Sequence, residues 1–455
     1  MRQLLIYITA IAANSACVLA QANVPQVTLG GLLDTQIGIV SQEDNFHRND
    51  FINDIAPGTL RDLAVVNDTH IFIKALQKTT YLDFGGEIKL NSDTSETKDG
   101  DRNVAEKTMA YVNGKFGRLE AGSYTGASRA LQVSAVSLAK ATGGIDGDAR
   151  YWWNDYPGDI DDPRNTDHDL TVSDLYLTVP QLYANNPVLV GIKGVNAAKI
   201  TYYTPKYQGF TAGISYIPDL NSYGTVFQAS RIFRSVTVGD VSTTANPDIF
   251  SAAPYRDVIE GGVRYDGKHG DYKLSVALVG QTGSAKLYQE RIDSSYGVHQ
   301  TSLLPFYKLR AWEAGIALGY QNFSVAAAYA NNNRSGEMVH NSDMLNNIKS
   351  SSYWNIGAAY DKGKLGVSAT YMQSRRGLTV GSLAVWPWAI NPERSKFTLF
   401  SLGFDYKITA GCKLYGEVDV FKAYSLYDSN VGIEFEGPSI ANAGHIILLG
   451  VKNHF

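Results

Sequence analysis

The chain repeats pairs of short strands in which apolar and polar residues alternate. In residues 69–77, for example, Ile71 and Ile73 share one parity, while His70 and Lys74 share the other. A period of two places successive side chains on opposite faces of a β-strand, so each strand has one apolar and one polar face. This pattern restricts the chain to folds in which many strands bury, or turn toward lipid, only one of their faces.

We expect about sixteen strands, at residues 27–40, 69–77, 82–90, 106–113, 118–124, 199–204, 210–217, 258–266, 272–281, 311–320, 323–330, 353–360, 365–373, 397–408, 413–423 and 445–455. Their connections alternate between short turns, such as GKFG at 114–117, and long polar stretches. This alternation is typical of a transmembrane antiparallel β-barrel, with short turns at one end and long loops at the other. A soluble all-β protein built of hairpins also alternates within its strands. It needs fewer strands, however, and does not confine its long loops to alternate connections.

The composition agrees with a membrane barrel. Charged residues make up 18% of the chain, whereas roughly 25% is usual in soluble domains. Glycine (43) and tyrosine (28) are abundant, as expected where strands alternate and aromatic rings lie at the membrane interfaces. Beyond the first 22 residues no run of 18 or more apolar residues occurs, which excludes a helical membrane protein.

Residues 1–22 are expected to be a secretory signal peptide. Arg2 is followed by an apolar segment at 4–19 and by Ala20-Gln21-Ala22, which offers a small-residue cleavage site. The barrel would then occupy residues 23–455. Cleavage removes Cys17 and leaves Cys412 alone, so we expect no internal disulfide.

One connection is far longer than the others. A strand within FGRLEAGSYTGASRAL, which starts at Phe116, is followed by residues 126–196 before strand-like sequence returns. Ordinary connections are a handful of residues long. This one also contains Tyr151, Trp152 and Trp153, and such aromatic content argues against a disordered tail. We therefore expect residues 126–196 to fold into the barrel lumen and to narrow the channel.

A narrow channel selects polar solutes through a field between acidic and basic side chains on its facing sides. Residues 126–196 contain nine Asp, and we expect the acidic side to consist of Asp146, Asp148, Asp155, Asp159, Asp161 and Asp162. The facing basic side would come from inward positions of the early strands, namely His70, Lys74, Lys89, Lys107 and Arg118. Three more residues would line the lumen, namely Glu120, Glu260 and Arg264. The Asp excess predicts a weak cation preference, although Asp is also common in exposed turns.

Three segments resemble the general diffusion porins of Gram-negative bacteria, most closely the alphaproteobacterial type. They are FGRLEAGSYTGASRAL, NPVLV at Asn186–Val190, and ITYYTPKYQGFTAGISY at Ile200–Tyr216. The resemblance implies a homotrimer of sixteen-stranded barrels in the outer membrane. It also implies that the third external loop lies in the pore and that small hydrophilic solutes and ions diffuse through. The third loop of this chain is longer than the resemblance leads us to expect.

Other functions stay open. A solute-specific channel is one alternative, and a surface adhesin or antigen anchored by its barrel is another, given the long loops at 219–254, 283–310 and 425–443. A barrel hydrolase would need a nucleophile beside His168 and its flanking Asp residues, yet no G-x-S-x-G motif occurs, so we expect no enzyme. We expect no metal or cofactor. A net charge of −4 without a basic patch argues against nucleic-acid binding.

Overall fold

The computed structural model describes residues 24–43, 48–49, 58–59, 62–92, 105–153, 176–220, 236–238, 241–244, 255–285, 288–293, 299–304, 306–337, 349–377, 392–427 and 441–455. The expected signal peptide lies outside these residues. Within them, no helix is both long and apolar enough to cross a membrane.

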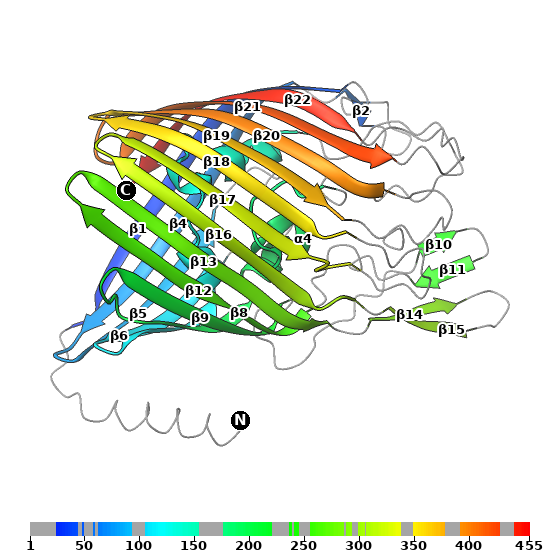
Figure 1. The fold of residues 1–455 in the computed structure, drawn as a ribbon, viewed down its shortest axis with the longest axis horizontal. Coiled ribbons are helices and arrows are strands. Elements are labelled where there is room, and N and C mark those ends of the chain that lie inside the picture. The colour runs from blue at the N-terminus through cyan, green and yellow to red at the C-terminus, as the bar shows by residue number, and fades with distance from the viewer. Residues whose placement is uncertain are drawn as a thin grey trace, which may run out of the picture.

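Sixteen strands of the described chain form a closed barrel (Figure 1). They are β1 (Gln26–Gln42), β4 (Leu63–Lys78), β5 (Leu82–Asn91), β6 (Ala105–Gly114), β7 (Gly117–Ser123), β8 (Ala198–Tyr203), β9 (Phe210–Asp219), β12 (Tyr255–His269), β13 (Tyr272–Ala285), β16 (Leu309–Tyr320), β17 (Phe323–Asn333), β18 (Ser351–Lys362), β19 (Leu365–Arg376), β20 (Pro392–Lys407), β21 (Cys412–Tyr427) and β22 (Asn442–His454). Each strand pairs antiparallel with its neighbours, and β1 closes the sheet on β22, from Leu32 opposite His454 to Gln42 opposite Gly444. The prediction of a barrel of about sixteen strands is confirmed.

The two ends of the barrel differ. Tight turns join the strand pairs at one end, where Gly270 and Gly363 adopt the positive φ angles of 57° and 61° that glycine tolerates without strain. At the other end, two small sheets lie beyond the barrel (Figure 1). One consists of β2 (Arg48–Asn49) and β3 (Gly58–Thr59); the other of β10 (Val236–Val238), β11 (Val241–Thr244), β14 (Tyr288–Asp293) and β15 (His299–Leu304).

Along most of each strand, side chains alternate between the inside and the outside of the barrel. In β16, Glu313 is buried inside while Ile316 and Leu318 are exposed on the outer face. Aromatic pairs mark both ends of this outer face. Trp312 packs against Tyr329 near the long-loop end, and Tyr272 packs against Tyr320 near the short turns, with ring centroids 5.6 Å and 4.7 Å apart. An apolar band between aromatic belts is the surface that a bilayer requires.

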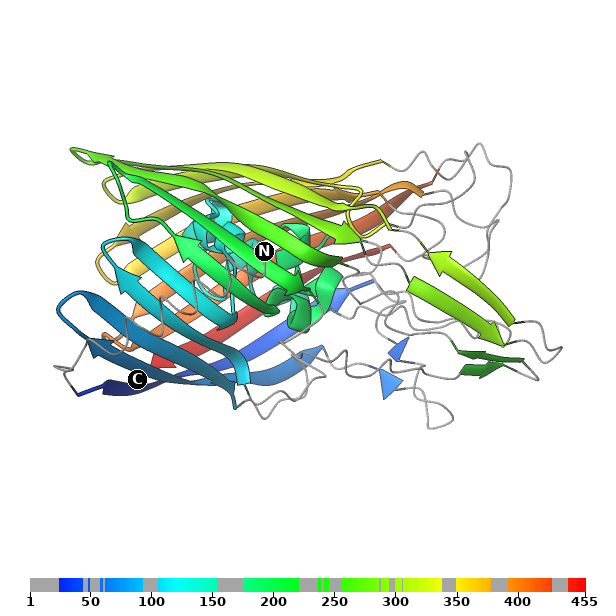
Figure 2. The same cartoon turned by 90° about the horizontal axis from the view of Figure 1, so that it is seen from below.

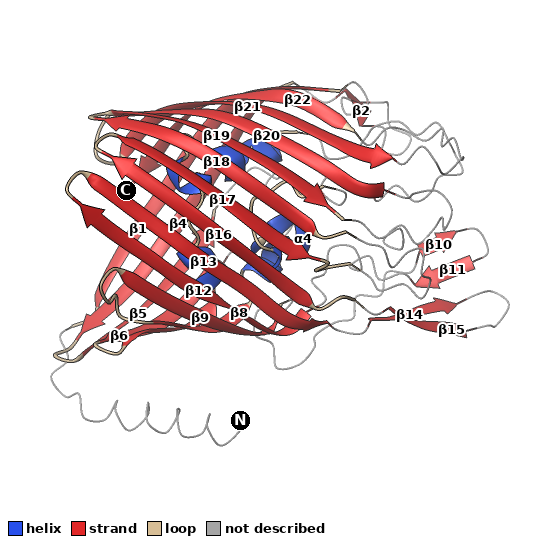
Figure 3. Cartoon of the chain, viewed as in Figure 1, coloured by secondary structure: helices blue, strands red, loops and turns tan. Residues whose placement is uncertain are grey.

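Short helices lie inside the barrel (Figures 2 and 3). They are α2 (Ala127–Leu131), η2 (Ala135–Leu138), η3 (Gly144–Asp146), η4 (Asp148–Tyr151), η5 (Tyr183–Asn185) and α4 (Pro187–Val195), the last of which is kinked at Gly191. All of them belong to the long connection between β7 and β8. We call its described parts, residues 124–153 and 176–197, the bound loop.

Candidate channel constriction

The bound loop follows the inner face of the barrel wall from β8 and β9 around to β21 and β1. Four of its backbone N–H groups donate hydrogen bonds to inward side chains on four strands: Ala127 to Ser215 Oγ (2.8 Å), Ala135 to Asn355 Oδ1 (3.0 Å), Lys140 to Ser368 Oγ (2.9 Å) and Ala141 to Asp405 Oδ1 (2.8 Å). A buried backbone group needs such a partner, because leaving it unpaired costs free energy. We call the strands from β8 through β22 to β1 the bound wall.

Glu417 of β21 accepts three hydrogen bonds from the loop. Its carboxylate accepts hydrogen bonds from the backbone N–H groups of Thr142 and Gly144, both at 3.2 Å, and from the Thr142 hydroxyl. The side chain is 2% exposed. Three hydrogen bonds converge on this one side chain, so it fixes the turn that precedes η3.

Glu260, which we expected to line the lumen, faces inward from β12 but is 1% exposed. It accepts hydrogen bonds from Ser128 Oγ at 2.5 Å and from Gln281 Nε2 at 3.0 Å. Glu313 of β16 is equally buried and accepts one from Gln132 Nε2 at 2.7 Å. These two acids hold the loop instead of meeting solvent, because the loop covers them. Strand parity correctly gave their direction but carries no information about what covers them.

An apolar cluster also fastens the loop. The Trp153 ring packs between Phe397 of β20 and Phe421 of β21, with centroid distances of 5.6 Å and 4.9 Å. Ile145 and Tyr176 of the loop belong to the same buried cluster. Apolar side chains on the inner face of a water-filled barrel need such a cover, so these positions favour a loop that stays against the wall.

The acidic side of the constriction differs from our expectation where it is described. Asp146 accepts hydrogen bonds from Arg129 Nη2 at 2.5 Å and Gln181 Nε2 at 2.7 Å, and Arg150 Nη1 lies 3.5 Å from it. Two guanidinium groups therefore surround one carboxylate. Burial acts to lower the pKa of Arg150, but Tyr151 and Asp146 outweigh it, and the pKa is raised.

Among the described residues, the other expected acids do not form an acidic face opposite the basic side chains. Asp148 accepts a hydrogen bond from Gln36 Nε2 of β1, on the bound wall. Asp155, Asp159, Asp161 and Asp162 lie outside the described residues, so the acidic face expected from them stays a prediction.

The expected basic side chains lie on four neighbouring strands, β4 to β7, and we call their inward face the charged arc. Each of four bases has an acid beside it: His70 with Asp68 (2.9 Å), Lys74 with Glu87 (3.3 Å), Lys89 with Glu106 (2.5 Å) and Arg118 with Glu120. The arc therefore carries alternating charges of both signs instead of a purely basic surface. The expected lumen-lining residue Glu120 belongs to it.

The alternation of inward and outward positions did not predict that Glu106 reaches into the barrel. The residue lies at the parity of the outward positions of β6, but a register shift between Lys89 and Leu90 of β5 places an extra residue there. Such a β-bulge redirects a side chain, and Glu106 reaches Lys89 inside the barrel. The sequence carries no clear signal for this shift.

Lys107 is the point at which the charged arc meets the loop. Its ammonium lies 3.4 Å from the Thr125 hydroxyl and also experiences the charges of Glu106 and of Arg129 on the loop. Arg264, the remaining expected lumen residue, lies closer to the short turns and pairs with Asp266 at 2.9 Å. Of the described residues, no group of three or more acidic, His or Cys side chains is placed to hold a metal ion.

A closed barrel with an apolar outer band and a loop fastened to its inner wall defines an outer-membrane channel. The sequence model of the Gram-negative porin family matches residues 8–423, and the chain belongs to that family. It is therefore a multi-pass protein of the outer membrane through which solutes diffuse passively.

The chain is also similar to two Rickettsia proteins in sequence and to two solved barrels in fold. The chain is 26% identical to a protein of Rickettsia bellii over 372 residues, 76% of this chain and 75% of that one. It is 27% identical to a protein of Rickettsia prowazekii over 384 residues, 77% and 78% of the two chains. An anion-selective porin from Comamonas acidovorans has a similar fold, with a TM-score of 0.51, 15% identity, and coverage of 95% of this chain and 100% of that one. A loop-deleted OmpT, an outer membrane protein of Vibrio cholerae, gives a TM-score of 0.50 at 11% identity over the same shares.

Proposed function

We propose that ions and small hydrophilic solutes cross the barrel between the bound loop and the charged arc. One observation carries this proposal. The loop is fastened to the bound wall by hydrogen bonds on strand after strand, whereas acids and bases of the charged arc pair with one another. Water and solutes pass where the wall offers charged groups that the loop leaves unused.

The chemistry of that passage suits polar solutes without favouring one of them. The charged arc carries ion pairs such as Lys74–Glu87 and Arg118–Glu120, and the loop carries the pair of Arg129 with Asp146. Side chains of both signs orient water and dipolar solutes and disfavour apolar ones. A cation preference would have to come from the loop Asp residues outside the described part, since Asp146 is already neutralised by its two arginines.

Single-channel recording in a planar lipid bilayer tests this function. The purified protein should give stable conductance steps that rise in proportion to salt concentration, as expected for a water-filled pore. An adhesin with a sealed barrel would give no steps, and a solute-specific channel would show saturable block by its substrate. Either outcome would replace the general diffusion channel with the corresponding alternative.

We also propose that the protein is a homotrimer whose subunits meet at the outer face of β1 and β4. Thr35 Oγ1 and Asn67 Oδ1 are hydrogen-bonded 2.9 Å apart on that outward face. Polar side chains are costly in hydrocarbon but are tolerated against another subunit. Light scattering of the detergent-solubilised protein should give three times the monomer mass, and a monomeric mass would contradict the assembly.

A further inference from the structure

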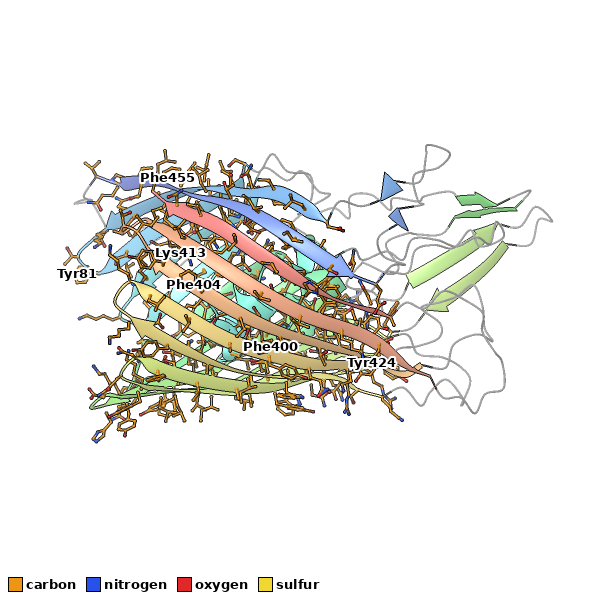
Figure 4. All side chains as sticks on the ribbon, turned by 90° about the horizontal axis from the view of Figure 1, so that it is seen from above. Tyr81, Phe400, Phe404, Lys413, Tyr424 and Phe455 are labelled. Atoms are coloured by element: carbon orange, nitrogen blue, oxygen red, sulfur yellow. The ribbon has the colours of Figure 1, made fainter. Side chains whose placement is uncertain are left out.

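The short-turn end of the barrel carries a ring of lysine side chains. Seven short turns of the described chain join barrel strands at this end, and all except the β16–β17 turn have an exposed lysine within the turn or at the end of the strand before it. Figure 4 shows Tyr81 of the β4–β5 turn at this end of the barrel, opposite to Tyr424. We call six residues the lysine ring, namely Lys78, Lys115, Lys206, Lys268, Lys364 and Lys407.

The ring continues the inner face of the barrel wall toward the mouth of the channel. Lys78 lies four positions after Lys74 of the charged arc, and Lys407 lies two positions after Asp405, which accepts a hydrogen bond from the bound loop. Side chains on one face of a strand recur every second residue, so both lysines have inward positions. Lys362 has an outward position on β18 and does not belong to the ring.

Few acidic side chains accompany the ring. Near the described turns, Asp266 and Asp361 already pair with other bases, at 2.9 Å and 2.8 Å. That leaves Asp83 and Asp271 beside six ammonium groups, and no acid of the described chain forms an ion pair with a lysine of the ring. Residues 1–23, which precede β1 at this end, contain no acidic residue. The short-turn end therefore has a surplus of positive charge.

The connections at the other end have the opposite composition. Residues 43–62 contain five acidic and two basic residues, and residues 428–441 contain three acidic and no basic residues. Both connections start and end at strands of the long-loop end. The basic surplus is thus a property of the short turns and not of the chain as a whole, whose net charge is −4.

Fixed charge at one mouth of a channel acts on ions over a distance that the salt concentration sets. The screening length is about 10 Å at 0.1 M and about 3 Å at 1 M ionic strength. Positive groups around an opening concentrate anions there and repel cations. In dilute salt the ring therefore makes its end of the channel selective for anions, whereas the paired charges of the charged arc let ions of both signs pass.

We propose that the lysine ring collects small anions at the short-turn mouth and makes the channel rectify, which means that it conducts better under one sign of voltage. This mouth faces the periplasm, as short turns of outer-membrane barrels do. Anions driven in through the ring arrive faster than the unselective interior carries them away, so salt accumulates in the channel and the conductance rises. Under the opposite voltage salt is depleted and the conductance falls. The inference rests on the proposed function as a diffusion channel.

Single-channel recording in a neutral phosphatidylcholine bilayer tests the proposal. Currents at equal voltages of both signs are compared in about 0.1 M and about 1 M KCl. The test variant, K78E/K115E/K206E/K268E, reverses four charges of the ring. The matched control, K308E/R310E/K396E/K422E, reverses four charges at the long-loop end. Each protein also carries biotin on a cysteine introduced by Thr80→Cys in a Cys412→Ser background, so that streptavidin added to one side reports the orientation of the channel.

In the dilute salt we expect the wild type to pass about 1.5-fold more current when the short-turn side is negative, and equal currents in the concentrated salt, where the ring is screened. The control should keep this ratio. The test variant should lose it, while an unchanged conductance in concentrated salt shows that it is folded.

Equal currents of both signs in the wild type in dilute salt, or a larger current when the short-turn side is positive, overturn the inference. So does a test variant that rectifies like the wild type. The salt dependence of the wild type decides the matter even where the test variant does not insert. These results leave the proposed function intact, because the channel still conducts, whereas a protein that gives no conductance steps overturns the proposed function itself.

Discussion

The bound wall and the charged arc use the same kinds of side chain for different purposes. On the bound wall, Glu260 and Glu417 are buried and accept hydrogen bonds from the loop. On the charged arc, Glu87 and Glu106 pair with lysines of the same face. All four carboxylates point into the barrel. Their roles differ because the loop covers one wall and leaves the other, so an inward direction alone does not define a pore-lining residue.

The difference extends to the apolar residues. The bound wall contributes Phe397 and Phe421 to a cluster closed by Trp153 of the loop. Apolar burial and backbone hydrogen bonds together make the loop a fixed part of the wall. The charged arc contributes paired charges. If this comparison is right, variants on the two walls should change different properties of the channel.

Trp153→Ala should have the largest effect. Removing a large buried aromatic side chain costs roughly 3–5 kcal/mol, and here that loss falls on the contact between loop and wall. We expect larger and noisier conductance steps and faster proteolysis within the loop. Phe404→Ala, which removes an outward-facing ring, is the control. Identical recordings for Trp153→Ala and wild type would mean that the cluster does not hold the loop.

Glu417→Ala should have the second largest effect. It leaves the N–H groups of Thr142 and Gly144 without their acceptor, at a cost of about 1–3 kcal/mol for each buried group. We expect increased current noise with unchanged ion selectivity. Glu87→Ala on the charged arc should do the reverse, changing selectivity without added noise. A selectivity change in Glu417→Ala would place this carboxylate in the aqueous path.

Lys107→Glu should shift the ion selectivity toward cations. A reversed charge at the point where arc and loop meet changes the energy of a passing ion by ~1 kcal/mol, roughly fivefold in the permeability ratio. The reversal potential under a salt gradient measures this. Lys362→Glu, an exposed position near the short turns, is the control and should leave the reversal potential unchanged.

Glu106→Gln should give the smallest effect, a few tenths of a kcal/mol, as is usual for a solvent-accessible ion pair. It removes the partner of Lys89 and makes the arc more positive. The reversal potential should move toward anions. A shift toward cations would show that Glu106 does not face the channel.

The sequence predicted the barrel well and its interior only in part. Strand number and side-chain direction follow from a period of two, which is a local property of the chain. What a side chain contacts is not a local property: Glu260 and Glu120 share the same pattern, yet Glu260 accepts a hydrogen bond from Ser128 of α2 and Glu120 pairs with Arg118. Asp146 was expected to face the basic arc, but Arg129, seventeen positions earlier in the same loop, neutralises it. The fold of an irregular loop decides such pairings, and no periodicity predicts it. The bulge at Glu106 was also not predicted, because the sequence carries no clear signal for the register shift between β5 and β6.

Thiol accessibility in the open channel tests the path of solutes most directly. In a Cys412→Ser background, single cysteines at Lys107 on the charged arc and at Ser368 beneath the loop are treated with a bulky charged methanethiosulfonate during bilayer recording. We predict that the reagent removes most of the conductance of Lys107→Cys and leaves that of Ser368→Cys unchanged. Block of Ser368→Cys together with an unaffected Lys107→Cys would place the water on the other side of the loop and contradict the account.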